Sequence, residues 1–294
     1  VDTTQSTIPA SGSESYELGQ FKTGGGGGGS NVDLSGEDVT LELRFTDGST
    51  TEVTLSADAS GSFSNLPGGQ VAFDDEDGDG EYDNSEKSYN QNKLENGVTT
   101  TEDLIVASSA DTIDPSGSVT FNAQRIEMYT GIDAGGSVTL KSDKGTKDGI
   151  NLNGNDLKSG GSVTVNGENV SLKGSTVESG GGNGVTIKAD KGNKDWVNVT
   201  DATITSDGSV TINAERVVGE NADITSSGGN AITIKGDKGT KGPVEIGGAT
   251  LDSSGSVTIN AERVDASDTT VYSSGGNAIT IKGDKGTKGP VDVS

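Results

Sequence analysis

Short runs of alternating apolar and polar residues recur along the second half of the chain. Each run reads Val-Thr-Ile or a close variant, so that apolar residues flank a threonine. Alternation with a period of two is the pattern of a β-strand that buries one face. The pattern therefore predicts eight equivalent strands, whose first apolar residues are Val119, Val138, Val163, Val185, Val210, Ile232, Val257 and Ile279.

The spacing of these strands indicates a solenoid. After a first step of 19 residues, the steps alternate between 25 and 22 residues, which makes a repeat of 47 residues. Two further short strands are predicted between successive runs, for example Arg216–Val218 and Ala222–Thr225, with Gly, Asn, Asp and Ser at the corners. Three short strands in each coil are typical of a parallel β-helix. We therefore predict an all-β fold in which residues 111–294 form a right-handed parallel β-helix, a β-solenoid of about eight coils.

The first 110 residues follow a different pattern. Residues 1–23 are a polar N-terminal segment, and residues 24–30 are a linker of six glycines and a serine. Residues 31–110 are predicted to form a small β-sandwich-like domain, with a hairpin of Val39–Phe45 and Thr51–Leu55, and residues 87–103 are predicted to be a loop. This domain precedes the first coil, where a solenoid needs a cap. Because the chain begins with Val1, we expect that a signal peptide has been removed.

One acidic stretch, residues 75–86, resembles the calcium-binding loop of EF-hand proteins. Carboxylates occupy loop positions 1, 3, 5, 9 and 12, and a glycine occupies position 6. This spacing wraps a short loop around an ion that prefers six to eight oxygen ligands. The resemblance implies that Ca²⁺ is bound by the carboxylates of five residues and the backbone carbonyl of Glu81; the full ligand set is Asp75, Asp77, Asp79, Glu81, Asp83 and Glu86. The alternative is a solvated acidic loop that binds no cation.

Composition narrows the choice of partners. The net charge is −24, which disfavours nucleic acid and anionic membrane surfaces as partners. The chain has no histidine and no cysteine, and no apolar run is long enough to span a membrane. Only 28% of the residues are hydrophobic, a content that a solenoid tolerates because its core is thin.

Two polar features repeat with the coils. The threonines of the Val-Thr-Ile runs are predicted to form an outward column, which suits either an exposed strand position or an ice-binding face. A lysine-rich loop follows every second run and is predicted to form either a self-neutralised turn or a lateral contact with acidic neighbours or acidic polysaccharide. The lysines of these loops are Lys144, Lys147, Lys191, Lys194, Lys238, Lys241, Lys285 and Lys288.

The last coil lacks a third strand when it is aligned on the preceding copy. An open coil end exposes unpaired backbone groups and apolar side chains, here Val291 and Val293. We expect the N-terminal segment of another copy, or its small β domain, to dock there by strand addition, so that copies join head to tail. The apolar or strand-forming residues of that segment are Val1, Thr7, Ile8, Tyr16, Leu18 and Phe21.

From residue 117 to residue 294, the units GSVTINAER and GGNAITIK resemble the β-helical repeats of filamentous-haemagglutinin-like adhesins. The resemblance covers about three fifths of the chain and implies an extracellular prokaryotic fibre or adhesin. The chain is short and shows no recognisable secretion domain, which favours a polymerising subunit over a single giant fibre. Three functions remain open: a subunit of a pilus-like or matrix-forming filament, a monomeric adhesin or carbohydrate-binding solenoid that contacts cell surfaces, and a polysaccharide lyase or hydrolase. The third is disfavoured because the chain has four arginines, one tryptophan and no histidine.

Overall fold

The computed structural model describes residues 39–44, 50–55, 66–83, 85–142, 149–189, 195–236, 242–275, 278–283 and 291–292. The chain divides into two compact units, residues 1–60 and residues 61–294. In the first unit, β1 (Val39–Arg44) pairs antiparallel with β2 (Thr50–Leu55), so the two strands of the predicted hairpin are present.

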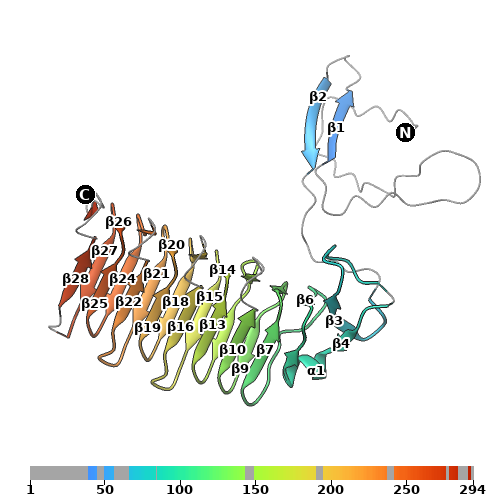
Figure 1. Cartoon of the computed structure of the whole chain (residues 1–294), viewed down its shortest axis with the longest axis horizontal. Coiled ribbons are helices and arrows are strands. Elements are labelled where there is room, and N and C mark those ends of the chain that lie inside the picture. Colours follow the sequence, from blue (N-terminus) through green and yellow to red (C-terminus); the bar gives the residue numbers. More distant parts are fainter. Residues whose placement is uncertain are drawn as a thin grey trace, which may run out of the picture. The chain divides into compact units, whose positions relative to one another are not determined.

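The second unit is a β-solenoid built from three sheets, and its coils follow one another from β7 to β28 in Figure 1. Sheet 1 has nine strands: β5 (Val98–Thr99), β7 (Val119–Ala123), β10 (Val138–Ser142), β13 (Val163–Gly167), β16 (Val185–Ala189), β19 (Val210–Asn213), β22 (Ile232–Lys235), β25 (Val257–Asn260) and β28 (Ile279–Lys282). Sheet 2 has eleven strands: β4 (Ser88–Asn90), β3 (Gln70–Asp75), β6 (Asp103–Val106), β8 (Ile126–Met128), β11 (Gly149–Asn151), β14 (Asn169–Ser171), β17 (Trp196–Asn198), β20 (Arg216–Val218), β23 (Pro243–Glu245), β26 (Arg263–Asp265) and β29 (Val291–Asp292). Sheet 3 has seven strands: β9 (Ile132–Ala134), β12 (Leu157–Ser159), β15 (Thr176–Ser179), β18 (Thr203–Ser206), β21 (Asp223–Ser226), β24 (Thr250–Ser253) and β27 (Thr270–Ser273).

The core is a set of aliphatic columns that run from coil to coil. In sheet 1, Val210 pairs with Ile232 and Ile212 pairs with Ile234, and all four side chains are fully buried. The intervening residues, Thr211 and Thr233, face outward in the same register. The predicted solenoid and its outward threonine column are therefore confirmed. Each coil contributes a few branched side chains, which pack well on a pleated strand. Stacking of neighbouring coils then buries these side chains.

Small residues form the corners between sheets. The corner after sheet 2 closes with a tight turn whose third residue has a positive φ, as Asp201 and Asn221 do. Glycine, asparagine and aspartate tolerate this conformation better than other residues. The corner after sheet 3 is closed by serines whose hydroxyls donate to a carbonyl of the preceding coil. These serines, which we call the serine ladder, are Ser159, Ser179, Ser206, Ser226, Ser253 and Ser273.

The solenoid begins earlier than the sequence analysis expected. β5 and β6 pair in parallel with β7 and β8, and β3 then pairs antiparallel with β6. The described strands between residues 70 and 106 thus continue the solenoid sheets, and the division between units falls near residue 60 rather than residue 110. The physical reason is that Leu104 and Val106 extend the buried column of Ile126 and Met128.

The predicted loop at residues 87–103 is also different. It contains β4, β5 and the short helix α1 (Gln91–Glu95), whose first turn is capped by the Asn90 side chain accepting from the Lys93 backbone amide. Leu94 of this helix is fully buried against the first coil. Among the described residues, no helix is both long and apolar enough to cross a membrane.

Candidate metal centre and surface hollow

The acidic loop connects β3 to β4 in an antiparallel hairpin at the edge of sheet 2. Because the two strands pair, the start and the end of the loop return to the same place. The structure gathers Asp75, Asp77 and Glu86 so that one carboxylate oxygen of each lies within 4.8 Å of the others. These are loop positions 1, 3 and 12 of the predicted set. Asp79, Glu81 and Asp83 lie on the same loop, and their carboxylates are not part of this group.

Backbone amides hold the gathered carboxylates in place. Asp75 accepts from the amides of Gly78 at 2.8 Å and Gly80 at 3.0 Å. Both glycines have a positive φ, a conformation that glycine adopts without a steric penalty. Glu86 accepts from the amides of Glu76 at 2.9 Å and Asp83 at 2.8 Å. The loop's own backbone amides therefore fold it around these two carboxylates.

Burial and mutual repulsion both disfavour the ionised forms of the carboxylates in this loop. Burial raises the pKa of Asp75, whose side chain is inaccessible to solvent, although two amide donors and Arg125 act in the opposite direction. Burial also raises the pKa of Glu86, which is 8% exposed, and the neighbouring carboxylates of Asp75 and Asp77 add to the increase. A cation would relieve both the desolvation and the repulsion. The donor set contains only oxygens, which suits hard divalent ions.

Arg125 links the loop to the first coils of sheet 2. Its guanidinium lies 3.2 Å from Asp75, 2.8 Å from Asp103 at the start of β6, and 3.8 Å from Glu127 in β8. The sequence analysis did not select this arginine. The sequence did contain a sign that this position matters, because arginine recurs at the same place in the repeat, at Arg216 and Arg263.

Aromatic packing anchors the other side of the loop. Tyr82, at loop position 8, is buried against Phe73 of β3 with its ring edge-on at 5.7 Å, and Ile105 of β6 completes the cluster. Asp74 does not join the metal-ligand group; it accepts a hydrogen bond from the Tyr89 hydroxyl, and burial together with Asp74 raises the pKa of Tyr89. The loop is thus fixed to the solenoid by a ring cluster and an ion pair.

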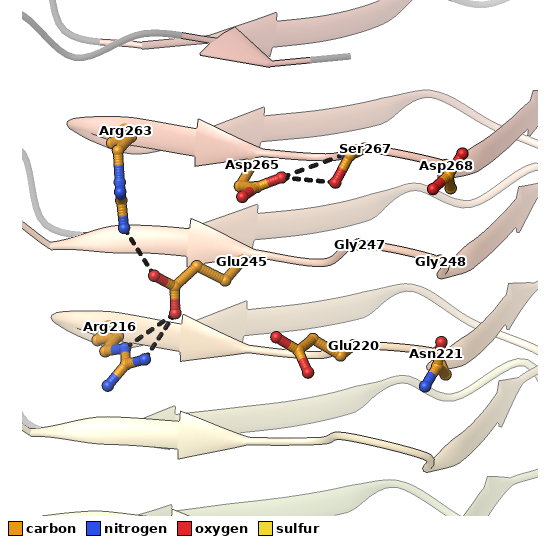
Figure 2. A pocket seen from close by; sticks show the side chains of 10 residues that line it. All are labelled: Arg216, Glu220, Asn221, Glu245, Gly247, Gly248, Arg263, Asp265, Ser267 and Asp268. Carbon is orange, nitrogen blue, oxygen red and sulfur yellow. Dashed lines mark hydrogen bonds and ion pairs between the residues drawn. The ribbon is translucent and has the colours of Figure 1, made fainter. Parts of the chain in front are cut away.

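A second candidate site is a hollow of about 620 Å³ on the outer side of β20, β23 and β26. Glu245 stands between Arg216 and Arg263 and accepts from them at 2.6 and 2.7 Å (Figure 2). The hollow opens because Gly247 and Gly248 have no side chains at a place where the adjoining coils carry longer ones, which are Glu220, Asn221, Ser267 and Asp268 (Figure 2). Its lining offers carboxylates, guanidinium groups and an amide, which suit a polar, hydroxyl-rich ligand.

The predicted contact residues are mostly untested by the structure. Val291 is described, pairs with Val264 and is 40% exposed. Val293, the six residues of the N-terminal segment and the eight lysines of the lysine-rich loops lie outside the described residues.

Comparison with known proteins adds no further assignment: no family model, no curated protein and no solved structure matches this chain. Functional inference therefore depends on the fold and on the geometry of these sites.

Proposed function

We propose that this chain is a structural subunit of a secreted, self-assembling extracellular filament, joined head to tail, with a calcium-stabilised cap. The observation that supports the proposal most is the state of the coil formed by β27, β28 and β29. Here Ile279 is 47% exposed. The in-register neighbour of Ile279, Val257, is fully buried. Among the described strands, β27, β28 and β29 stand at the ends of their sheets, so this coil offers an exposed apolar side chain and strand edges that another strand can cover.

The opposite end of the solenoid constrains how copies join. α1 buries Leu94, and β3 runs antiparallel to β6, so the first coil is closed by a cap. A second copy that simply stacked coil on coil would meet this cap rather than an open column. We therefore favour strand addition by the N-terminal segment, residues 1–23, of the next copy. Covering one exposed Val or Ile side chain contributes about 1.5–3 kcal/mol.

The calcium component of the proposal concerns the acidic loop. Asp75, Asp77 and Glu86 supply gathered carboxylates, and Asp79, Asp83 and the Glu81 carbonyl are the remaining proposed ligands. Among hard divalent ions, Ca²⁺ fits best because it accepts many oxygen ligands in a flexible arrangement, whereas Mg²⁺ demands a near-ideal octahedron. In this role the ion closes the loop between β3 and β4 and so stabilises the hairpin that covers the edge of β6.

Negative-stain imaging of the purified protein tests the filament. The full-length chain and a variant without residues 1–29 are compared, each with calcium and with a chelator. Long fibres from the full-length chain alone would support head-to-tail joining through the N-terminal segment. Isolated short rods from both chains, in both conditions, would refute the filament.

The surface hollow favours one alternative, a monomeric adhesin that binds carbohydrate. Two glycines and several charged or polar side chains line the hollow, and such a lining suits a sugar. A glycan array probed with the wild-type chain and with Gly247→Gln, which would place a side chain in the hollow, separates this function from the filament. Binding that disappears in the variant, from a protein that stays monomeric, would favour the adhesin.

A further inference from the structure

We propose that the outer face of sheet 1 in one copy packs against the outer face of sheet 3 in a second copy, so that the solenoids associate side by side. This contact uses different surfaces from the proposed end-to-end joint. It can therefore be present or absent independently of that joint.

The outer face of sheet 1 carries positive charge only. Its outward positions are a column of threonines and a column in which asparagine and lysine alternate from coil to coil. The lysines of the second column are Lys141, Lys188, Lys235 and Lys282. All four are exposed, and within the part of the chain that the structure describes none of their ammonium groups makes a hydrogen bond or an ion pair. No carboxylate occupies an outward position of strands β7 to β28 in this sheet.

The outer face of sheet 3 is acidic. Asp133, Glu178 and Asp223 are exposed on β9, β15 and β21, and Asp252 is exposed on β24. In the described residues, none of these four carboxylates has a hydrogen-bond or ion-pair partner. The one lysine on this face, Lys158, lies 3.9 Å from Asp156. Among the described residues, the two faces therefore carry opposite charges, and the four lysines of sheet 1 and the four carboxylates of sheet 3 have no side-chain partner there.

The spacing of the charges also matches. Successive lysines of sheet 1 are separated by two coils, because an asparagine strand lies between each pair. β9, β15 and β21 are likewise separated by two strands in the order of sheet 3. Two strand spacings amount to about 9.6 Å. Asp133 and Glu178 share one column, because both pair with Lys158, so these two carboxylates stand at the interval of successive lysines on sheet 1. Asp223 pairs with Thr203, two residues along the strand from the column of Glu178 and Thr205, so its carboxylate stands beside that column rather than in it.

Both faces are suited to close approach. The outward side chains between the charges are short, chiefly threonine, as in Thr186 and Thr211 on sheet 1 and Thr203 and Thr205 on sheet 3. A second copy is favoured over an acidic polysaccharide because the complementary charges and the short side chains between them are both found on this chain itself. Sheet 1 against sheet 3 is a heterologous contact, which repeats into an open array rather than a closed dimer.

Cross-linking of mixed copies tests the contact. Isotopically light and heavy full-length chains are mixed at low ionic strength, treated with a zero-length carbodiimide and digested. We expect light-to-heavy peptides that join the sheet 1 lysines to Asp133, Glu178 or Asp223, and we expect them to fall about tenfold when salt screens the pairs. Absence of light-to-heavy links between these two faces would overturn the proposal.

Charge reversal supplies the control. One variant carries Lys141→Glu, Lys188→Glu and Lys235→Glu, another carries Asp133→Lys, Glu178→Lys and Asp223→Lys, and a third carries all six. The third keeps the wild-type net charge of −24. We expect each single-face variant to lose the light-to-heavy links and the combined variant to recover them.

A response to net charge alone would instead make the less negative sheet 3 variant associate most, which would refute the proposal. Lysines that cross-link only to added polygalacturonate would also refute it and would assign the sheet 1 face to polysaccharide. Filament length by imaging is read on the same samples. Loss of fibres with retained lateral links would separate failure of the end-to-end joint from failure of this contact.

Discussion

At the scale of single residues, the corner after sheet 3 depends on small polar side chains and glycine, whereas the interior of the coils is apolar. Ser206 is fully buried, donates to the Asn183 carbonyl at 2.9 Å and accepts from the Gly208 amide at 3.0 Å. A Cβ on Gly208 would collide with the Asn183 backbone, so the corner accepts only glycine at that place. These residues join one coil to the next where the branched core residues do not reach.

Ser206→Ala should lower the free energy of unfolding by about 1–3 kcal/mol, because it leaves a buried carbonyl and a buried amide without this partner. Equilibrium urea denaturation measures the change. Ser227→Ala is the matched control, since Ser227 is exposed and its hydroxyl contacts the exposed Asp207. Its expected effect is within about 0.5 kcal/mol. If the two substitutions changed the free energy of unfolding by the same small amount, the serine ladder would add no stability.

Glu86→Gln should lower calcium affinity by roughly tenfold or more, because it removes the charge of the proposed bidentate ligand. The amide keeps one oxygen for the loop's backbone donors, so the fold of the hairpin should persist. Calorimetric titration of calcium into the chelator-treated protein measures the change. Glu76→Gln is the control, because Glu76 is the exposed neighbour on the loop and lies outside the gathered group. An unchanged titration for Glu86→Gln would count against the loop as a calcium site.

At the scale of elements, the strands of the regular coils could be predicted and the cap could not. The period-two pattern around Val210 and Ile232 and the 47-residue repeat identify strands because each repeats the same burial. In the cap, one buried residue, Leu94, decides the position of a five-residue helix, and so short an element has no periodicity to detect. Arg125 was missed for a related reason: its partners, Asp75 and Asp103, lie 50 and 22 residues away in the sequence.

The cap hairpin should respond to pH in opposite ways with and without calcium. In the cation-free protein, burial raises the pKa of Asp75 above 3.8 and that of Glu86 above 4.5, so the folded state binds more protons than the unfolded state. Stability then decreases as the pH rises from these ordinary values through the raised ones. Bound calcium favours the ionised carboxylates, so the stability of the calcium-bound protein should increase over the same interval. Thermal melting with chelator and with calcium, followed by near-ultraviolet circular dichroism of the cap tyrosines, measures both trends, and a chelated protein that gains stability with rising pH would contradict the argument.

At the scale of the whole molecule, the proposed self-association has to overcome a net charge of −24. General repulsion opposes association, so contacts must be local and specific. Two such places are available on the solenoid: the apolar column at β28 and the charge-segregated faces of sheets 1 and 3. They act along and across the solenoid axis, and their dependence on salt should differ, since burial of apolar surface is not weakened by screening.

Ile279→Lys tests the contact along the axis. The substitution places a charge in the exposed column, where a docked strand would have to bury it, and it removes about 2 kcal/mol of apolar burial per joint. The concentration needed for filament growth, measured by light scattering, should rise by about thirtyfold or more. Thr280→Lys is the matched control, because it adds the same charge to the same strand on the outward face, beside Thr258. Growth that is impaired equally by both substitutions would indicate a general effect of charge, and growth that is unaffected by Ile279→Lys would exclude this coil as the joint between subunits.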